Sequence, residues 1–162
     1  MLSTLIQWLI SLFSVRIVFS QVNEEFLQIV SNVSLGQNGQ VGSTCLLSMV
    51  LNDRLTVANI GDSIALLVNK DGSVHQMNTE HKPTANAERC RIEEAGGIVL
   101  AHRVQGELSV SRAFGDFELK NYISAEPDVR SLELNQNHDL LILASDGIFR
   151  SYPGDKIVTR IN

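Results

Sequence analysis

The sequence predicts an α+β domain built on antiparallel β-strands. Several short apolar runs occur along the chain, and polar turn residues separate them. Helical spacing of apolar residues is confined to a few segments. The chain has 162 residues, and 44% of them are hydrophobic, which suits one globular domain with a buried core. Several short strands with a few helices are typical of an antiparallel α+β domain.

The first predicted element is an apolar segment. Residues 2–19 carry one charge, Arg16. Three interpretations stay open: a membrane-spanning helix, a signal peptide, and a start that replaces the domain's own first residues. We therefore separate residues 1–22 from a domain over residues 23–162.

The next elements are one helix and four strands. Phe26, Leu27, Val30 and Val33 lie at helical spacing and predict a helix over 24–33. Asn52-Asp53 and Lys70-Asp71-Gly72 are turn signals that separate apolar runs. The runs predict strands over 44–51, 55–60, 64–68 and 74–77.

The second half of the domain alternates between helix and strand. Thr84 is the expected N-cap of a helix that Gly96-Gly97 ends. The remaining predicted elements are extended pieces over 98–101 and 107–110, strands over 129–134 and 140–144, and a last helix from Pro153.

The charge of the chain argues against nucleic acid as a partner. The formal net charge is −5, and the sequence has a pI of about 5.3. Binding to nucleic acid needs a clustered basic face, and the sequence contains no basic patch with interleaved aromatic residues.

Two aspartates are candidates for metal binding. Asp146 follows the apolar run 140–144, and Gly147 lets the backbone turn sharply after it. Asp62 lies between two predicted strands. Mg²⁺ and Mn²⁺ prefer carboxylate oxygens as ligands. The alternative for each aspartate is a turn without a ligand, an Asp-Gly turn at Asp146 and an Asx-turn at Asp62.

Four patterns in one order carry a family resemblance. They are Gly42-Ser43-Thr44, Ala58 to Ser63 (ANIGDS), Arg103 to Asp116 (RVQGELSVSRAFGD) and Ala144-Ser145-Asp146-Gly147. Together they resemble the PPM-type (type 2C) metal-dependent protein serine/threonine phosphatases. The resemblance implies a sandwich of two antiparallel β-sheets flanked by helices. It also implies hydrolysis of phosphoserine and phosphothreonine in phosphorylated proteins by a water that Mg²⁺ or Mn²⁺ activates. The resemblance implies that Asp146 binds the catalytic metal centre and that Asp62 lies near it, at an additional and weaker metal site.

The sequence also departs from this family. Ile64 stands where the family usually has Arg, Arg150 replaces a second acid after Asp146, and nothing matches the family's leading Asp-Gly-His-Gly motif. We therefore expect a partial domain, an incomplete metal centre and little or no phosphatase activity of this chain alone. The alternative function is that of a pseudophosphatase, which keeps the fold as a binding or adaptor module.

Basic residues and location complete the predictions. Arg89, Arg91 and Arg112 are candidates for phosphate binding, but internal pairing is the favoured interpretation. His81 is treated as structural. The family resemblance implies an intracellular protein of the cytosol or nucleus. The alternatives are a membrane-anchored, luminal or mitochondrial location, and residues 2–19 are the only predicted route to a membrane.

Overall fold

The computed structural model describes residues 2–32 and 41–151. These residues form two compact units. The first unit comprises Met1–Thr44 and His81–Pro127, and the second comprises Cys45–Glu80 and Asp128–Asn162. Each unit is described separately below.

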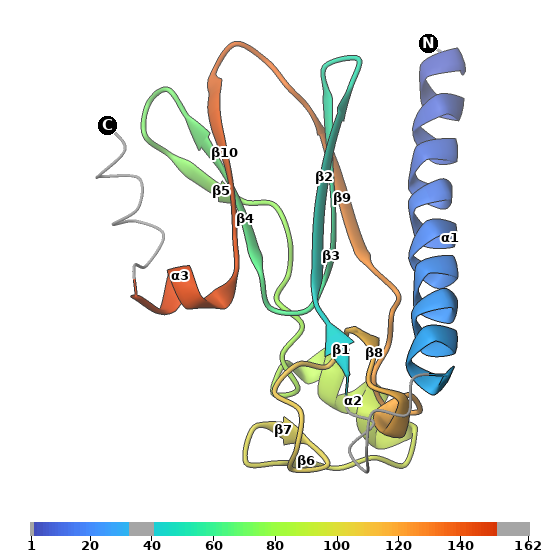
Figure 1. The fold of residues 1–162 in the computed structure, drawn as a ribbon. Helices are drawn as coiled ribbons and strands as arrows, with labels where there is room; N and C mark the ends of the chain where they lie inside the picture. Colours follow the sequence, from blue (N-terminus) through green and yellow to red (C-terminus); the bar gives the residue numbers. More distant parts are fainter. Residues whose placement is uncertain (1, 33–40, 152–162) are drawn as a thin grey trace. The chain divides into compact units, whose positions relative to one another are not determined.

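The second unit contains two three-stranded antiparallel sheets (Figure 1). One sheet has the order β2–β3–β9, and the other has the order β10–β4–β5. The strands are β2 (Cys45–Leu51), β3 (Arg54–Ile60), β4 (Ile64–Asn69), β5 (Val74–Gln76), β9 (Asp128–Glu133) and β10 (His138–Ala144). The six predicted strands of this unit are confirmed to within a few residues.

The two sheets share one hydrophobic core. Leu55 and Val57 of β3 pack in the same cluster as Ala65 and Leu67 of β4, together with Met77. The central strand of each sheet is therefore buried, and β3 is buried from residue 55 to residue 60. The antiparallel α+β class that the sequence predicted is confirmed.

The first unit combines helices with very short strands. Its elements are α1 (Leu2–Asn32), β1 (Gly42–Ser43), α2 (Asn86–Glu94), β6 (Val99–Leu100), β7 (Arg103–Val104), β8 (Phe114–Gly115) and the 3₁₀ helix η1 (Phe117–Leu119). β1 pairs with β8, and β6 pairs with β7, both antiparallel. Its core is a cluster of Ile92, Val104, Val110, Ala113, Leu119 and Ile123.

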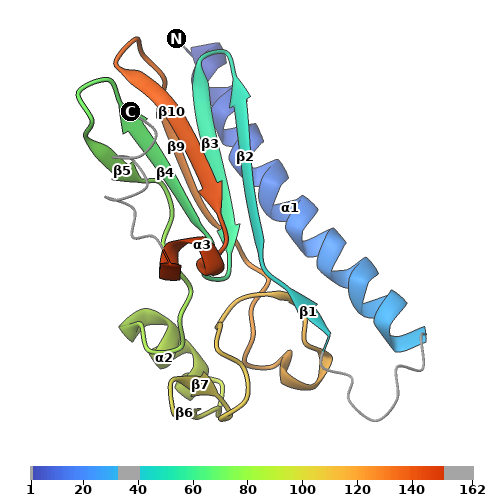
Figure 2. The same cartoon turned by 60° about the vertical axis from the view of Figure 1, so that its left-hand side comes forward.

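Helix α1 is much longer than the helix predicted over 24–33. It runs without interruption from Leu2 to Asn32 (Figure 2). Phe19 is buried and packs on Phe114, with ring centroids 5.3 Å apart. Within the described part of the chain, no helix has both the length and the apolar character needed to cross a membrane.

Three local predictions need correction. Ala85, and not Thr84, is the N-cap of α2, because Thr84 lies in a turn that the Ala85 N–H closes by donating to the Lys82 carbonyl at 3.0 Å. Residues 107–110 are not a strand, because Gln105 and Gly106 adopt positive φ angles and turn the chain back immediately after β7.

The third correction concerns the region after β10. A short helix, α3 (Asp146–Ser151), follows β10 where only a turn was expected. The last helix, predicted from Pro153, lies outside the described residues.

Candidate functional site

The register of β4 and β10 brings the two predicted metal ligands to the same end of one sheet. Ala144, the last residue of β10, pairs with Ile64, the first residue of β4. Asp146 lies two residues after Ala144, and Asp62 lies two residues before Ile64. Because the two strands are antiparallel, both aspartates leave the sheet at the same end, where β10 runs into α3 (Figure 2).

Asp62 is buried in the turn that leads from one sheet to the other. The turn, Gly61 to Ser63, follows β3 of the β2–β3–β9 sheet and precedes β4 of the β10–β4–β5 sheet. Gly61 has a φ of 104°, a conformation that favours glycine. Asp62 and Ser63 are each 8% exposed. The Asp62 carboxylate is therefore held in a largely dry position on a fixed turn.

Asp146 has a more open environment. It is the first residue of α3, and its side chain is 38% exposed. Its Oδ2 forms an ion pair with the guanidinium of Arg150, which lies one turn later in the same helix, at 2.9 Å. The Arg150 side chain is 73% exposed, and such a surface ion pair contributes only about 0.3–0.5 kcal/mol. A divalent cation can therefore compete with Arg150 for this carboxylate.

The two carboxylates match part of a site for a hard divalent cation. Carboxylate oxygens are the ligands that Mg²⁺ and Mn²⁺ prefer, and the sheet register delivers two of them to one end of the second unit. Over residues 2–32 and 41–151, no cluster of three or more His, Cys, Asp or Glu side chains is placed to hold a metal. Among the described residues, this end of the sheet therefore offers two carboxylates, at Asp62 and Asp146, and no clustered third ligand of these types.

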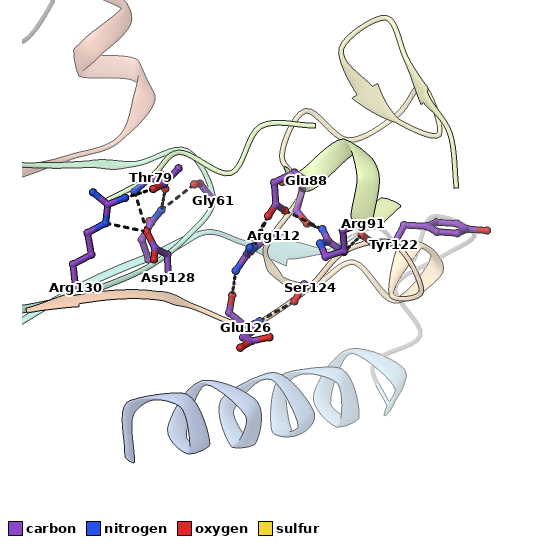
Figure 3. Close-up of polar contacts among 12 residues, drawn as sticks. Gly61, Thr79, Glu88, Arg91, Arg112, Tyr122, Ser124, Glu126, Asp128 and Arg130 are labelled. Carbon is purple, nitrogen blue, oxygen red and sulfur yellow. Dashed lines mark hydrogen bonds and ion pairs between the residues drawn. The ribbon is translucent and has the colours of Figure 1, made fainter. Parts of the chain in front are cut away.

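The three arginines that could have bound phosphate are paired within the first unit. Arg112 and Arg91 both bond to Glu88, a residue of α2 that is 4% exposed (Figure 3). Arg112 also donates to the Glu126 carbonyl, and Arg91 donates to the Tyr122 carbonyl, both at 2.8 Å.

Arg89 pairs with Glu93 along the same helix at 2.7 Å. Internal pairing, the interpretation that the sequence favoured, is thus confirmed for Arg89 as well as for Arg91 and Arg112. All three guanidinium groups have acidic partners in the first unit.

The charge of Glu88 is fixed by its two arginines. Burial by itself raises the pKa of Glu88, but hydrogen bonds and the charge of Arg112, with a further hydrogen bond from Arg91, lower it to about 2. The carboxylate is therefore ionised at neutral pH. This network ties α2 to the segments that carry Arg112 and Tyr122 within the first unit.

His81 has the structural environment that the sequence predicted. It is 2% exposed, and its backbone carbonyl accepts a hydrogen bond from the Ser111 N–H at 2.9 Å. This bond ties the start of the His81-Lys82-Pro83 segment to the segment that leads into β8.

Two of the sequence motifs are in direct contact within the first unit. Gly42 pairs with Gly115, and the Asp116 carboxylate lies over the Gly42 Cα, where a Cβ would come within 2.1 Å of Oδ2. Asp116 is 6% exposed, and burial raises the pKa of its carboxyl group. The glycine of the Gly-Ser-Thr pattern is thus required by the aspartate at the end of the RVQGELSVSRAFGD pattern.

Sequence reasoning missed the polar residues that surround the Asp62 turn. Asn59, Asn78, Thr79, Asp128 and Arg130 form hydrogen bonds at this end of the second unit. Figure 3 shows Arg130 and Asp128 next to Thr79, with Gly61 close by. The only signal in the sequence was the position of Asn59 inside the ANIGDS pattern, because the other four residues lie in unremarkable surroundings.

Comparisons with known proteins agree with the fold and with these motifs. The family model described as protein phosphatase 2C matches residues 10–162. The chain is 39% identical over 146 residues to probable protein phosphatase 2C 59 of Arabidopsis thaliana, covering 88% of this chain and 45% of that protein. It is 44% identical over 126 residues to probable protein phosphatase 2C 41 of Oryza sativa subsp. japonica, covering 74% of this chain and 43% of that protein.

Solved structures with a similar fold also include a protein phosphatase 2C. A serine-threonine phosphatase 2C from Toxoplasma gondii superimposes with a TM-score of 0.79 at 25% identity, covering 91% of this chain and 54% of that one. A Caenorhabditis elegans sex determining protein also gives a TM-score of 0.79 at 25% identity, covering 89% of this chain and 36% of that one. The chain thus spans less than half the length of both curated relatives named above.

Proposed function

Because this chain belongs to the protein phosphatase 2C family, we propose that the protein removes phosphate from phosphoserine and phosphothreonine in other proteins. The observation that carries the proposal is the placement of Asp62 and Asp146 at the same end of the β4–β10 pair. The family motifs mark Asp146 as a ligand of the catalytic metal centre and Asp62 as a residue of an additional, weaker metal site nearby. The substrates are phosphorylated proteins, since the family acts on them.

The described carboxylates are assigned distinct roles in binding Mg²⁺ or Mn²⁺. Asp62, buried in its turn, is the fixed ligand. Asp146, at the start of α3, is the ligand that changes partner, because its ion pair with Arg150 must break before it binds the cation. When bound, such a cation neutralises charge on the phosphoryl oxygens and lowers the pKa of the attacking water. The residues of this chain hold and orient that centre.

The direct test is release of phosphate from a phosphothreonine peptide by the purified 162-residue chain in Mn²⁺. We expect slow release that a chelator abolishes and that Asp146→Asn removes, because a metal ligand is lost. The expectation of a low rate for this chain alone stays a prediction, and the same assay tests it. Phosphate release that persists in the chelator would contradict the proposed chemistry.

The alternative is a binding module that keeps the fold without catalysis. The observation that favours it is the ion pair between Arg150 and Asp146, which occupies a carboxylate needed for metal binding. Under this alternative, the chain binds the phosphopeptide with the same affinity with and without Mn²⁺ and releases no phosphate. Under the phosphatase proposal, Arg150→Gln leaves the fold intact and raises Mn²⁺ affinity about twofold, as the loss of a weak competing ion pair predicts.

A further inference from the structure

The turn that carries Asp62 lies outside the two β-ladders that it joins. Gly61 to Ser63 connect β3 in one sheet to β4 in the other, so these residues leave both hydrogen-bond ladders. Their buried carbonyl groups nevertheless need hydrogen-bond donors. Two asparagine side chains supply them, one on each side of Asp62.

Asn78 holds the side of the turn that leads into β4. Its Nδ2 donates to the Ser63 carbonyl at 2.8 Å, and its Oδ1 accepts from the Ala65 N–H at 2.7 Å. The last residue pair of β4 and β5 is Leu66 with Gln76, so the Asn78 amide continues the ladder where β5 has ended. Asn78 is 2% exposed, so both bonds are shielded from water.

Asn59 holds the side of the turn that follows β3. Its Nδ2 donates to the Gly61 carbonyl at 3.0 Å and to the Thr79 carbonyl at 2.9 Å. Asn59 is fully buried. Because Thr79 directly follows Asn78 in the chain, the two asparagines tie the Asp62 turn to one segment, residues 78–79.

This segment is anchored in turn to β9. The Thr79 N–H donates to Asp128 Oδ2 at 3.2 Å, and the Arg130 guanidinium donates to the Thr79 hydroxyl (Figure 3). Asp128 is the β9 residue that pairs with Asn59 in β3. We call the hydrogen bonds of Asn59, Asn78 and Thr79 at this turn the asparagine clamp. The asparagine clamp connects the turn to both sheets of the second unit.

We propose that Asn59 and Asn78 are positioning residues for Asp62, holding its turn in the one conformation that presents the carboxylate to a divalent cation. The inference rests on the proposed function, since it takes Asp62 to be a metal ligand. The asparagines themselves do not touch the metal. They act through the carbonyl groups on either side of Asp62, and a ligand fixed before binding loses less conformational freedom when the cation arrives.

The experiment uses the full 162-residue chain, Mn²⁺ as the probe and three measurements. The measurements are the Mn²⁺ dissociation constant from water-proton relaxation, hydrogen exchange of the amides of residues 62–65 without metal, and the thermal midpoint without metal. The variants are Asn59→Ala and Asn78→Ala, each alone and combined with Asp62→Asn. Asn59→Ser and Asn78→Ser replace them if an alanine variant does not fold.

Asn69→Ala is the matched control. Asn69 lies at the opposite end of β4 and donates its side-chain amide to the Ser73 hydroxyl at 2.8 Å. Its removal therefore deletes an amide donor from the same strand without touching the Asp62 turn.

For a positioning role, Asn59→Ala and Asn78→Ala each weaken Mn²⁺ binding about tenfold, the lower range for outer-shell partners of metal ligands. They also speed amide exchange in residues 62–65, and neither changes Mn²⁺ binding further when Asp62 is already Asn. Asn69→Ala leaves both measurements unchanged.

Three results would each overturn the positioning role while leaving the proposed metal role intact. They are an unchanged Mn²⁺ affinity in the asparagine variants, an equal loss of affinity when Asp62→Asn is already present, and unchanged amide exchange. If the wild-type chain shows no Mn²⁺ binding that Asp62→Asn removes, the proposed metal role fails and the positioning role fails with it.

Discussion

At the residue scale, the clearest non-catalytic feature is a buried carboxylate between two guanidinium groups. Glu88 contacts Arg112 and Arg91, and its pKa is lowered to about 2 from an ordinary value of 4.5. Between these two pH values the unfolded chain binds more protons than the folded chain. The stability that Glu88 contributes is therefore complete above about pH 4.5 and is lost as the pH falls towards 2.

Glu88→Gln is expected to destabilise the first unit at pH 7 by about 3–5 kcal/mol, because two partly buried guanidinium groups lose their counter-charge. It should also flatten the loss of stability between pH 4.5 and 2. Urea unfolding at several pH values measures both effects. Glu93→Gln is the control, since Glu93 forms a surface ion pair with Arg89. Equal effects of the two substitutions would contradict the central role of Glu88.

At the element scale, α1 is fixed to the first unit by both apolar and polar contacts. Phe19 is 3% exposed and packs on Phe114 of β8. The Asn23 Oδ1 accepts a hydrogen bond from the Gly115 N–H at 3.0 Å, and Arg16 forms an ion pair with Glu126 at 3.0 Å. The buried Phe19 ring stabilises this attachment more than the ion pair does, because the ion pair is exposed to solvent.

Phe19→Ala should lower the free energy of unfolding by about 3–5 kcal/mol, because it removes a buried ring and leaves a cavity against Phe114. Phe13→Ala is the matched control in the same helix, because Phe13 is 67% exposed, and its effect should stay within about 0.5 kcal/mol. Urea unfolding followed by circular dichroism makes the comparison. If both substitutions had the same small effect, α1 would not be docked on β8.

At the scale of the whole molecule, the sequence predicted the strands better than the contacts between them. The runs at Leu55 to Ile60 and Leu140 to Ala144 were recognisable because turn residues bound them. The strands β1 and β8, of two residues each, carry no periodic signal. Helix α1 was underestimated because its apolar start was interpreted separately from the amphipathic part that follows.

The candidate site was only partly predictable, because local patterns mark single residues and not the contacts between distant segments. Asp62 and Asp146 could be named from their motifs, since each follows an apolar strand and is adjacent to a glycine in the sequence. Their placement at one end of a sheet depends on the pairing of Ala144 with Ile64, which no local pattern specifies. The contact of Gly42 with Asp116 and the asparagine clamp likewise join residues far apart in the chain.

Mn²⁺ titration followed by nuclear magnetic resonance asks whether Asp62 and Asp146 lie at one binding site for a divalent cation, as we propose. Paramagnetic Mn²⁺ broadens the signals of nearby amides. We expect residues 61–63 and 145–147 to broaden first. Asp146→Asn should abolish this effect, whereas Asp71→Asn, at the β4–β5 turn, should not. Broadening centred elsewhere, or broadening at these residues that survives Asp146→Asn, would contradict the proposal.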